Sequence, residues 1–389
     1  MKVGVLGGGQ LGRMLALAGL PLGLRFRFFD PVSDAPAGHL AEHHPARYDD
    51  ESALTRFAHG LDVVTYEFEN VPHATARFLS RLVPMRPGAT ALAVAQDRLE
   101  EKRCFRRLGI DTAAFEPAET LAELRRAVKA IGLPAILKTR RMGYDGKGQR
   151  VLHAAAEVES AWESLGGAPL LLEAFVSFDR ELSIIAVRGA RPGGAEGSAP
   201  VDADDGAHVT LFYPLVENEH RTGILRRSLA PADSVSSALR ETAERFAALV
   251  MHDLDYRGVL ALELFQVGDR LLVNEMAPRV HNSGHWTIEG AETSQFENHL
   301  RAVLGLPLGS TAPVGCSAML NLIGHVPPID ALFSVEGAHV HLYGKSAKPG
   351  RKLGHVTVRA DRRAALEARL GKMQRIIEAT ENGLPLSRE

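Results

Sequence analysis

The first ninety residues alternate between short apolar runs and longer stretches with helical periodicity. Residues 2–6, 24–29 and 62–65 are predicted strands, and helices are predicted from residue 10 and over residues 51–59. Strands that alternate with helices favour a parallel, doubly wound sheet. The chain therefore opens with a domain of α/β class.

The pattern becomes mixed beyond residue 89. Helices are predicted over residues 89–109, 121–131, 155–165 and 231–252, and strands over residues 135–139, 150–153, 170–175, 181–187, 258–266 and 271–275. Residues 189–206 are rich in Gly, Pro, Ala and Asp, which is typical of a mobile surface insertion. After about residue 307, strands near 316–323, 340–343 and 353–358 and a helix over 362–379 predict a small separate domain. The later part of the chain is thus expected to be α+β.

The composition is that of a globular protein with no excess of either charge, which excludes a disordered chain, a collagen and a coiled-coil rod. Among 389 residues, 45 are basic and 47 acidic, so the net charge is −2. This length predicts two or three domains, and the charge balance disfavours a nucleic-acid partner. The 2 cysteines indicate a reducing cytosol rather than a disulfide framework. The longest early apolar run, residues 14–24, is shorter than the roughly 18 residues of a membrane span, so a cytoplasmic protein is expected.

A glycine motif follows the first predicted strand. Gly7, Gly9 and Gly12 have the GxGxxG spacing, and Asp30 ends the second predicted strand. Glycines allow a tight turn close to a phosphate, and an acid at such a strand end binds a ribose hydroxyl in dinucleotide-binding folds. One hypothesis is therefore an NAD(P)-dependent dehydrogenase, although no hydride-transfer site is recognisable later in the chain. The alternative is a tight strand-to-helix turn without a ligand.

A cationic glycine loop is predicted between two strands. Five basic residues, three glycines and the single acid Asp145 lie between Lys138 and Arg150, both included. Such a loop suits phosphates because it offers positive charge and backbone N–H groups. Its spacing is not that of a Walker A loop. The alternative is an exposed basic hairpin tip.

Two glutamates lie symmetrically about a predicted turn. Glu263 and Glu275 are equidistant from a turn near Gly268, so a hairpin would place them opposite each other. Opposed carboxylates repel unless a cation lies between them or one is protonated, and Mg²⁺ is commonly held by such a pair with substrate phosphates. Asn274 adds an oxygen, although strand alternation would turn it to the other face unless the strand bends. The alternative is a pair of solvated surface glutamates.

Two further polar clusters follow. Residues 278–287 combine a guanidinium, two imidazoles, an amide and hydroxyls, and Arg279 suits a planar oxyanion such as bicarbonate or phosphate. Residues 345–352 hold four basic side chains and no acid, which fits an anion site or, alternatively, a solubilising loop.

Together these motifs resemble the ATP-grasp enzymes, and among them the 5-(carboxyamino)imidazole ribonucleotide synthases of purine biosynthesis. The resemblance rests on residues 7–14 (GGGQLGRM), 143–149 (GYDGKGQ), 274–275 (NE), 278–287 (PRVHNSGHWT) and 349–355 (PGRKLGH). It implies a doubly wound pre-ATP-grasp domain over residues 1–97, a two-lobed ATP-grasp domain over 98–310 and a small C-terminal domain over 311–389. It also implies a ligase that is a cytoplasmic homodimer.

The resemblance assigns most of the motifs to ligands. The metal ligands for Mg²⁺ would be Glu263 and Glu275. ATP would contact Arg98, Lys138, Gly143, Tyr144, Asp145, Gly146, Lys147, Gly148, Gln149, Glu173, Ala174, Phe175, Val176, Glu181, His220, Asn274 and Glu275. The ribonucleotide and bicarbonate would contact Gln10, Tyr144, Asp145, Arg279, His281, Asn282, Ser283, Lys345, Arg351 and Lys352. Lys147 stands where relatives often carry Arg, which puts its role in doubt.

The implied reaction is the carboxylation of the exocyclic amine of 5-aminoimidazole ribonucleotide, with ATP and bicarbonate giving ADP and phosphate through carboxyphosphate. Asp145, Arg279 and Lys345 are the candidate catalytic residues. A different ATP-grasp carboxylate–amine ligase and a nucleotide-binding module without turnover are further alternatives.

Overall fold

The N-terminal part of the chain forms a four-stranded parallel sheet. The computed structural model describes residues 1–143, 146–167, 169–191 and 207–381. The sheet order is β3-β2-β1-β4, and every pairing in it is parallel, as the alternating pattern predicts. Its elements are β1 (Lys2–Leu6), α1 (Gln10–Gly19), η1 (Leu20–Leu22), β2 (Arg25–Phe29), β3 (Glu42–His44), α2 (Glu51–Ala58), β4 (Val63–Tyr66) and α3 (His73–Leu79). Within this sheet, β3 is the strand that the sequence pattern missed.

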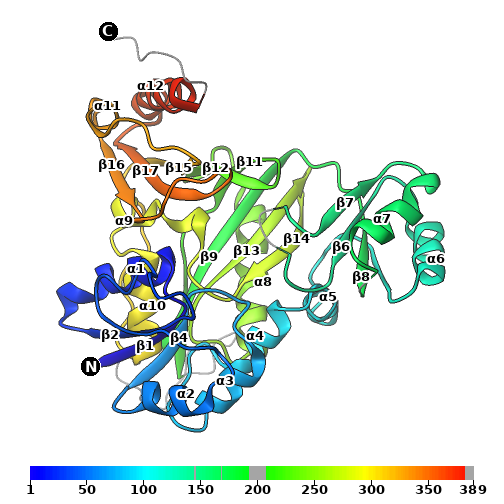
Figure 1. Cartoon of the computed structure of the whole chain (residues 1–389). Coiled ribbons are helices and arrows are strands. Elements are labelled where there is room, and N and C mark those ends of the chain that lie inside the picture. Colours follow the sequence, from blue (N-terminus) through cyan, green and yellow to red (C-terminus); the bar gives the residue numbers. More distant parts are fainter. Residues whose placement is uncertain (144–145, 168, 192–206, 382–389) are drawn as a thin grey trace.

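A second, antiparallel sheet forms a lobe that projects from the rest of the molecule (Figure 1). Its order is β5-β8-β6-β7, and α6 and α7 cover it. The bounds are β5 (Phe115–Ala118), α6 (Leu121–Ile131), β6 (Ala135–Thr139), β7 (Gln149–Leu152), η2 (Ala155–Glu157), α7 (Val158–Ser164) and β8 (Leu170–Ala174). Helix α6 begins where the Thr120 hydroxyl accepts the Glu123 N–H and ends at Gly132, whose φ of 86° favours glycine.

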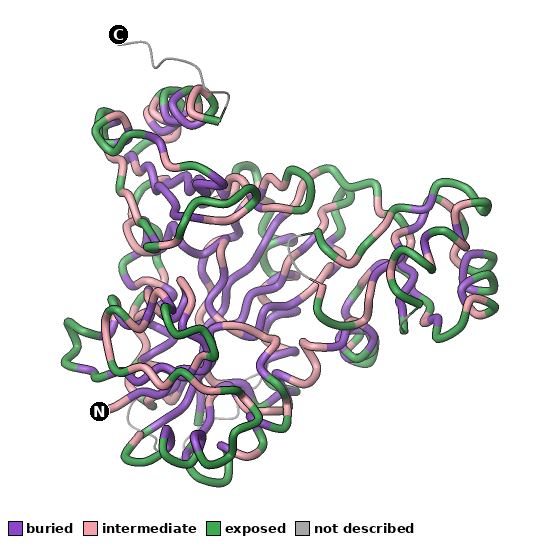
Figure 2. The backbone as a smooth tube through the Cα atoms, viewed as in Figure 1, coloured by how far each residue is buried: buried purple, intermediate pink, exposed green. Residues whose placement is uncertain are grey.

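A nine-stranded sheet forms the centre of the molecule. Its order is β14-β13-β9-β11-β12-β15-β17-β16, and β10 adds to β9. Its strands are β9 (Arg180–Ala190), β10 (His208–Phe212), β11 (Val216–Arg221), β12 (Ile224–Ala230), β13 (Gly258–Val267), β14 (Arg270–Ala277), β15 (Cys316–Ile323), β16 (Ala338–Leu342) and β17 (Lys352–Ala360). Figure 2 shows that buried residues dominate the middle strands of this sheet.

Helices connect the sheets and cover the central one. They are α4 (Ala89–Ala95), α5 (Arg98–Arg107), α8 (Ser237–Asp253), η3 (Asn282–Gly284), α9 (Thr287–Gly290), α10 (Gln295–Leu304), α11 (Ile329–Phe333) and α12 (Arg363–Glu381). Helix α8 begins later than predicted because the Ser236 hydroxyl caps it at the Leu239 N–H. Among the described residues no helix is both long and apolar enough to cross a bilayer.

The C-terminal segment has its own apolar core beneath α12, as expected for a small domain, and its strands extend the central sheet because β15 pairs with β12. The predicted surface insertion over 189–206 begins too early, because Gly189 and Ala190 belong to β9 and pair with β10. Residues 192–206 lie outside the described part of the chain.

Candidate active site

A cleft of about 810 Å³ is lined by residues of the lobe sheet and the central sheet, and by α1 and the segment after β4 of the N-terminal domain. This volume is within the range of small-molecule sites. Most of the predicted site residues line it, namely Gln10, Arg98, Lys138, Gly143, Gly146, Gln149, Glu173, Ala174, Phe175, Val176, Glu181, His220, Glu263, Asn274, Glu275, Arg279, His281, Asn282 and Lys352. Tyr144 and Asp145 lie outside the described residues. The lining does not include Lys147, Gly148, Ser283, Lys345 or Arg351.

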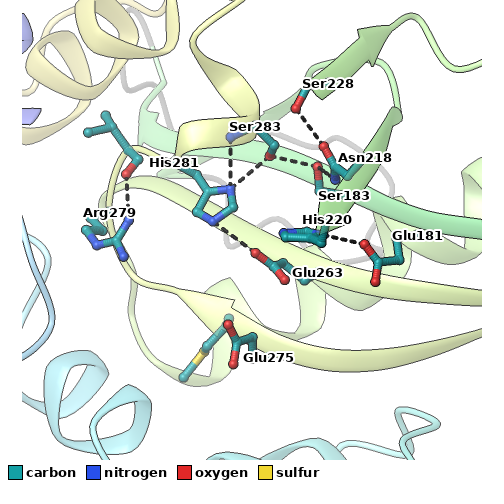
Figure 3. A network of polar contacts seen from close by, with 12 residues as sticks. Glu181, Ser183, Asn218, His220, Ser228, Glu263, Glu275, Arg279, His281 and Ser283 are labelled. Atoms are coloured by element: carbon teal, nitrogen blue, oxygen red, sulfur yellow. Dashed lines mark hydrogen bonds and ion pairs between the residues drawn. The ribbon is translucent and has the colours of Figure 1, made fainter. Parts of the chain in front are cut away.

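The predicted glutamate hairpin is confirmed. Strands β13 and β14 are antiparallel, and Glu263 lies opposite Glu275 (Figure 3). The register shifts immediately after this pair, so that Leu264 lies opposite Val273 and Asn274 is the extra residue. This bulge breaks the strand's alternation, and Asn274 and Glu275 both line the cleft. The hairpin therefore presents three oxygen-bearing side chains to one space.

Each glutamate has a cationic or N–H-donating neighbour. Arg98 Nη1 donates to Glu275 Oε2 at 2.7 Å, and His281 Nε2 lies 3.2 Å from Glu263 Oε1. Burial would raise the pKa of Glu263, but the hydrogen bond from His281 and the surrounding positive charge outweigh it and lower that pKa to about 2. Glu263 is therefore ionised at neutral pH.

The oxygen atoms that the hairpin presents are suitable ligands for Mg²⁺. Carboxylate and amide oxygens are hard ligands, and Mg²⁺ usually takes one or two carboxylates and completes its shell with phosphates and water. Among the residues that the structure describes, no group of three or more His, Cys, Asp and Glu could hold a metal alone. Glu263 and Glu275 thus fit a metal that is shared with a phosphate ligand.

A buried charge cluster lies on the lobe side of the cleft. Lys138 Nζ is 3.1 Å from Glu173 Oε1, and Lys102 Nζ is 3.2 Å from Glu173 Oε2. Burial would raise the pKa of Glu173, but these two ammonium groups outweigh it and lower that pKa to about 2. The sequence analysis missed Lys102, whose position one helical turn after Arg98 on α5 was the available signal.

His220 and Glu181 form a pair on neighbouring strands. Strand β11 pairs with β9, and His220 Nδ1 contacts Glu181 Oε2. Burial would lower the pKa of His220, but the hydrogen bond to Glu181 and the negative charge of Glu263 raise it. Both residues line the cleft, where the resemblance predicts the nucleotide.

The polar loop after β14 is fixed by partners that the sequence did not indicate. Arg279 Nε donates to Glu69 Oε2 at 2.5 Å. Gln295, the first residue of α10, binds the His281 backbone on both sides, accepting its N–H at 2.9 Å and donating to its carbonyl at 2.7 Å. The available signal for Glu69 was its place just beyond the carboxyl end of β4, where ligands of α/β sheets gather.

Asn282 is a residue of this loop with unused hydrogen-bonding capacity on its side chain. Both polar atoms of its side chain are buried and find no hydrogen-bond partner among the described residues. Asn282 also lines the cleft. Because buried amides are nearly always paired in native proteins, this side chain is available to a bound substrate.

The GxGxxG turn is occupied by the protein's own carboxylates. Glu67 accepts the backbone N–H groups of Gly9 and Gly12, the latter at 2.6 Å, and Asp30 accepts that of Gly8 at 2.8 Å. These are the donors that a dinucleotide pyrophosphate would need. The geometry does not support the dehydrogenase hypothesis, because Glu67 takes the anion's place.

The C-terminal basic cluster meets the N-terminal domain. Lys345 Nζ contacts Gln10 Oε1, although the two residues are 335 positions apart in the sequence. Lys352, from the same basic cluster, lines the cleft together with Gln10. Arg351 Nη1 instead donates to Ser346 Oγ at 2.9 Å. The structure thus brings together Gln10 and Lys345, both expected at the ribonucleotide site, and the binding of the ribonucleotide by these residues and by Arg351 stays a prediction.

Three family models match successive parts of the chain. They are the ribonucleotide synthetase preATP-grasp domain over residues 1–96, the ATP-grasp domain over 103–296 and the phosphoribosylaminoimidazole carboxylase C-terminal domain over 317–369. Among curated proteins, the N5-carboxyaminoimidazole ribonucleotide synthase of Pseudomonas aeruginosa is 54% identical over 379 residues, 97% of this chain and 100% of that protein.

Solved structures agree with this match. The N5-carboxyaminoimidazole ribonucleotide synthetase of Thermus thermophilus has a TM-score of 0.89 and 55% identity, with 100% of each chain covered. The N5-carboxyaminoimidazole synthase of Aspergillus clavatus, in complex with ADP and 5-aminoimidazole ribonucleotide, has a TM-score of 0.86 and 32% identity, with 97% of this chain and 98% of that chain covered.

Proposed function

The chain belongs to the N5-carboxyaminoimidazole ribonucleotide synthases, and from this premise we propose how its cleft carries out their reaction. It is an ATP-grasp ligase that couples ATP to the carboxylation of 5-aminoimidazole ribonucleotide. One observation carries the residue assignment: a single cleft joins the Glu263–Glu275 pair to the oxyanion-binding loop at Arg279. A nucleotide and its acceptor can therefore meet without leaving the cavity.

The nucleotide occupies the side of the cleft that β6, β8 and the glutamate hairpin line. Lys138 and Arg98 contact the phosphates, and residues 143–149 close over them. Residues 173–176, at the end of β8, hold the adenine, and the Glu181–His220 pair takes the ribose. Glu263 and Glu275 would hold Mg²⁺, which would supply charge neutralisation at the phosphates. Phosphoryl transfer depends mostly on such alignment and neutralisation, which supports this arrangement.

Bicarbonate and the ribonucleotide occupy the other side. Arg279, His281 and Asn282 bind bicarbonate, while Gln10, Lys345 and Lys352 bind the ribonucleotide and its phosphate. The Glu69–Arg279 ion pair supports the first assignment, because it fixes a guanidinium at the cleft wall. Ser283 is fully buried behind His281, so it acts on bicarbonate through that ring.

The reaction has two steps. A bicarbonate oxygen attacks the γ-phosphorus, the bond to the β–γ bridging oxygen breaks, and ADP leaves carboxyphosphate in the cleft. The exocyclic amine then attacks the carboxyl carbon, phosphate leaves with the C–O electrons, and the amine gives up one proton. Asp145, outside the described residues, is the proposed acceptor of that proton. Carboxyphosphate hydrolyses readily, so closure of the 143–149 loop excludes water at this stage.

Two properties are inferred from the family resemblance and the composition. We infer a cytoplasmic protein, consistent with its 2 free cysteines, and a homodimer. The molar mass in solution tests the second inference: twice the 42.1 kDa of the chain is expected.

The assignment predicts that ADP release requires every reactant. With Mg²⁺, ATP, bicarbonate and 5-aminoimidazole ribonucleotide, a coupled assay should report steady ADP formation, and omission of any one should reduce it to background. ADP formation that ignores the ribonucleotide would instead support a different ATP-grasp ligase. Consumption of NADH without ATP turnover would revive the dehydrogenase hypothesis.

A further inference from the structure

A chain of buried hydrogen bonds crosses the central sheet and ends at the cleft (Figure 3). Ser228 Oγ donates to Asn218 Oδ1 at 2.7 Å, Asn218 Nδ2 donates to Ser183 Oγ at 3.0 Å, and Ser183 Oγ donates to Ser283 Oγ at 2.8 Å. Ser283 Oγ lies 2.8 Å from His281 Nδ1. The ring's other nitrogen faces Glu263, so the chain connects the sheet interior to the glutamate pair.

The strand register puts these side chains in one line. Ser183 on β9 lies directly opposite Glu263 on β13, and Asn218 on β11 lies directly opposite Ser228 on β12. All three of the sheet residues Ser183, Asn218 and Ser228 are buried. An apolar residue would fill such positions at lower desolvation cost, so polar side chains here call for a reason beyond packing.

The direction of the chain is set at its cleft end. The Ser283 backbone N–H donates to His281 Nδ1 at 3.3 Å, so this nitrogen carries a lone pair and the proton sits on Nε2. Nε2–H then points to the Glu263 carboxylate, which can only accept. The Ser283 hydroxyl lies 2.8 Å from the same nitrogen and donates to it, while the hydrogen bond that its oxygen accepts from Ser183 keeps its proton turned towards Nδ1.

We propose that Ser228, Asn218 and Ser183 are positioning residues that lock His281 in its Nε2–H tautomer and fix its ring between Glu263 and the bicarbonate subsite. The proposal rests on the proposed function. Without the Ser183 hydroxyl, the Ser283 hydroxyl loses the hydrogen bond that turns its proton towards Nδ1, and the ring can then also take the Nδ1–H form, in which a bare Nε2 lone pair faces the Glu263 carboxylate. The ring turns away, and bicarbonate loses a partner.

The test is Ser183→Ala, compared with Ser317→Ala as the matched control. Both serines are buried on the central sheet, but the Ser317 hydroxyl makes no hydrogen bond with the described residues. In Ser183→Ala the KM for bicarbonate should rise about tenfold, the usual scale for a residue that orients a ligand-binding histidine, while the KM for ATP stays within about twofold. Ser317→Ala should change neither constant.

A second readout is independent of catalysis. In protein labelled with ¹⁵N-histidine, the His281 signals are those that His281→Gln removes, and their shifts report the tautomer. Wild type should show Nε2–H alone, and Ser183→Ala both tautomers. Ser228→Ala, at the far end of the hydrogen-bond chain, should change the bicarbonate KM and the tautomer signals in the same direction but by less. This variant replaces Ser183→Ala in the test if Ser183→Ala does not fold.

Two outcomes overturn the proposal. One is an unchanged bicarbonate KM in both variants, and the other is a pure Nε2–H tautomer in both. Failure of the proposed function is distinguishable, because wild type would then release no ribonucleotide-dependent ADP while the tautomer measurement still decides whether the chain controls His281.

Discussion

Glu275→Gln should lower the turnover of ribonucleotide-dependent ADP release by about a thousandfold, because the loss of several kcal/mol of phosphate charge stabilisation corresponds to that factor. The amide keeps the shape of the side chain but loses its charge. It can neither share Mg²⁺ with Glu263 nor balance Arg98, whose Nη1 lies 2.7 Å from Glu275 Oε2. The fold should survive, since the Glu275 side chain is 37% exposed.

The same hairpin offers a matched control. Asp269→Asn removes a carboxylate from the exposed turn between β13 and β14, away from the cleft, and should leave turnover within about twofold of wild type, as is usual for surface substitutions. Circular dichroism and the Tm would confirm that both variants fold. Near-normal ADP release by Glu275→Gln would remove the metal assignment from the hairpin.

Features that depend on local periodicity were predictable from the sequence. The opposition of Glu263 and Glu275 follows from strand alternation and from a turn centred near Gly268. The same rule turns Asn274 to the other face unless the strand bends, and the bulge beside Glu275 is such a bend. The hairpin register was thus predictable from alternation, whereas the bulge leaves no clear signal in these residues.

Features that depend on distant partners were not predictable from these patterns. The GxGxxG turn has the spacing of a dinucleotide site, yet what binds its N–H groups is Glu67, which lies 55 positions after Gly12. Lys102 and Gln295 likewise act through residues of other elements, namely Glu173 and His281. A sequence motif indicates which hydrogen-bond donors are present. The tertiary structure shows which of these donors already bind another part of the protein.

Glu173→Gln should lower the free energy of unfolding by about 3–5 kcal/mol at pH 7, the cost of leaving a buried ion pair with one partner. Lys102 and Lys138 both depend on this carboxylate, and the side chains of Lys102, Lys138 and Glu173 are 1%, 7% and 4% exposed. Burial lowers the pKa of Lys102, so without Glu173 it must stay charged beside Lys138 or give up its proton. Either response destabilises the lobe.

Urea unfolding measures this effect, with Glu116→Gln on the exposed face of the same sheet as the control.

The pH dependence of this stabilisation follows from the pKa of Glu173, which is about 2 in the folded protein and has an ordinary value of 4.5. A carboxyl with a lowered pKa stabilises fully above its unfolded pKa, and this contribution disappears as the pH falls through the folded pKa. The difference in the free energy of unfolding between wild type and Glu173→Gln should therefore be constant above about pH 5 and shrink from there towards pH 2.

Adding Lys102→Met to Glu173→Gln should recover part of the lost stability, because it removes one of the two cations. Equal urea midpoints for wild type and Glu173→Gln at pH 7 would show that the two lysines do not need this carboxylate.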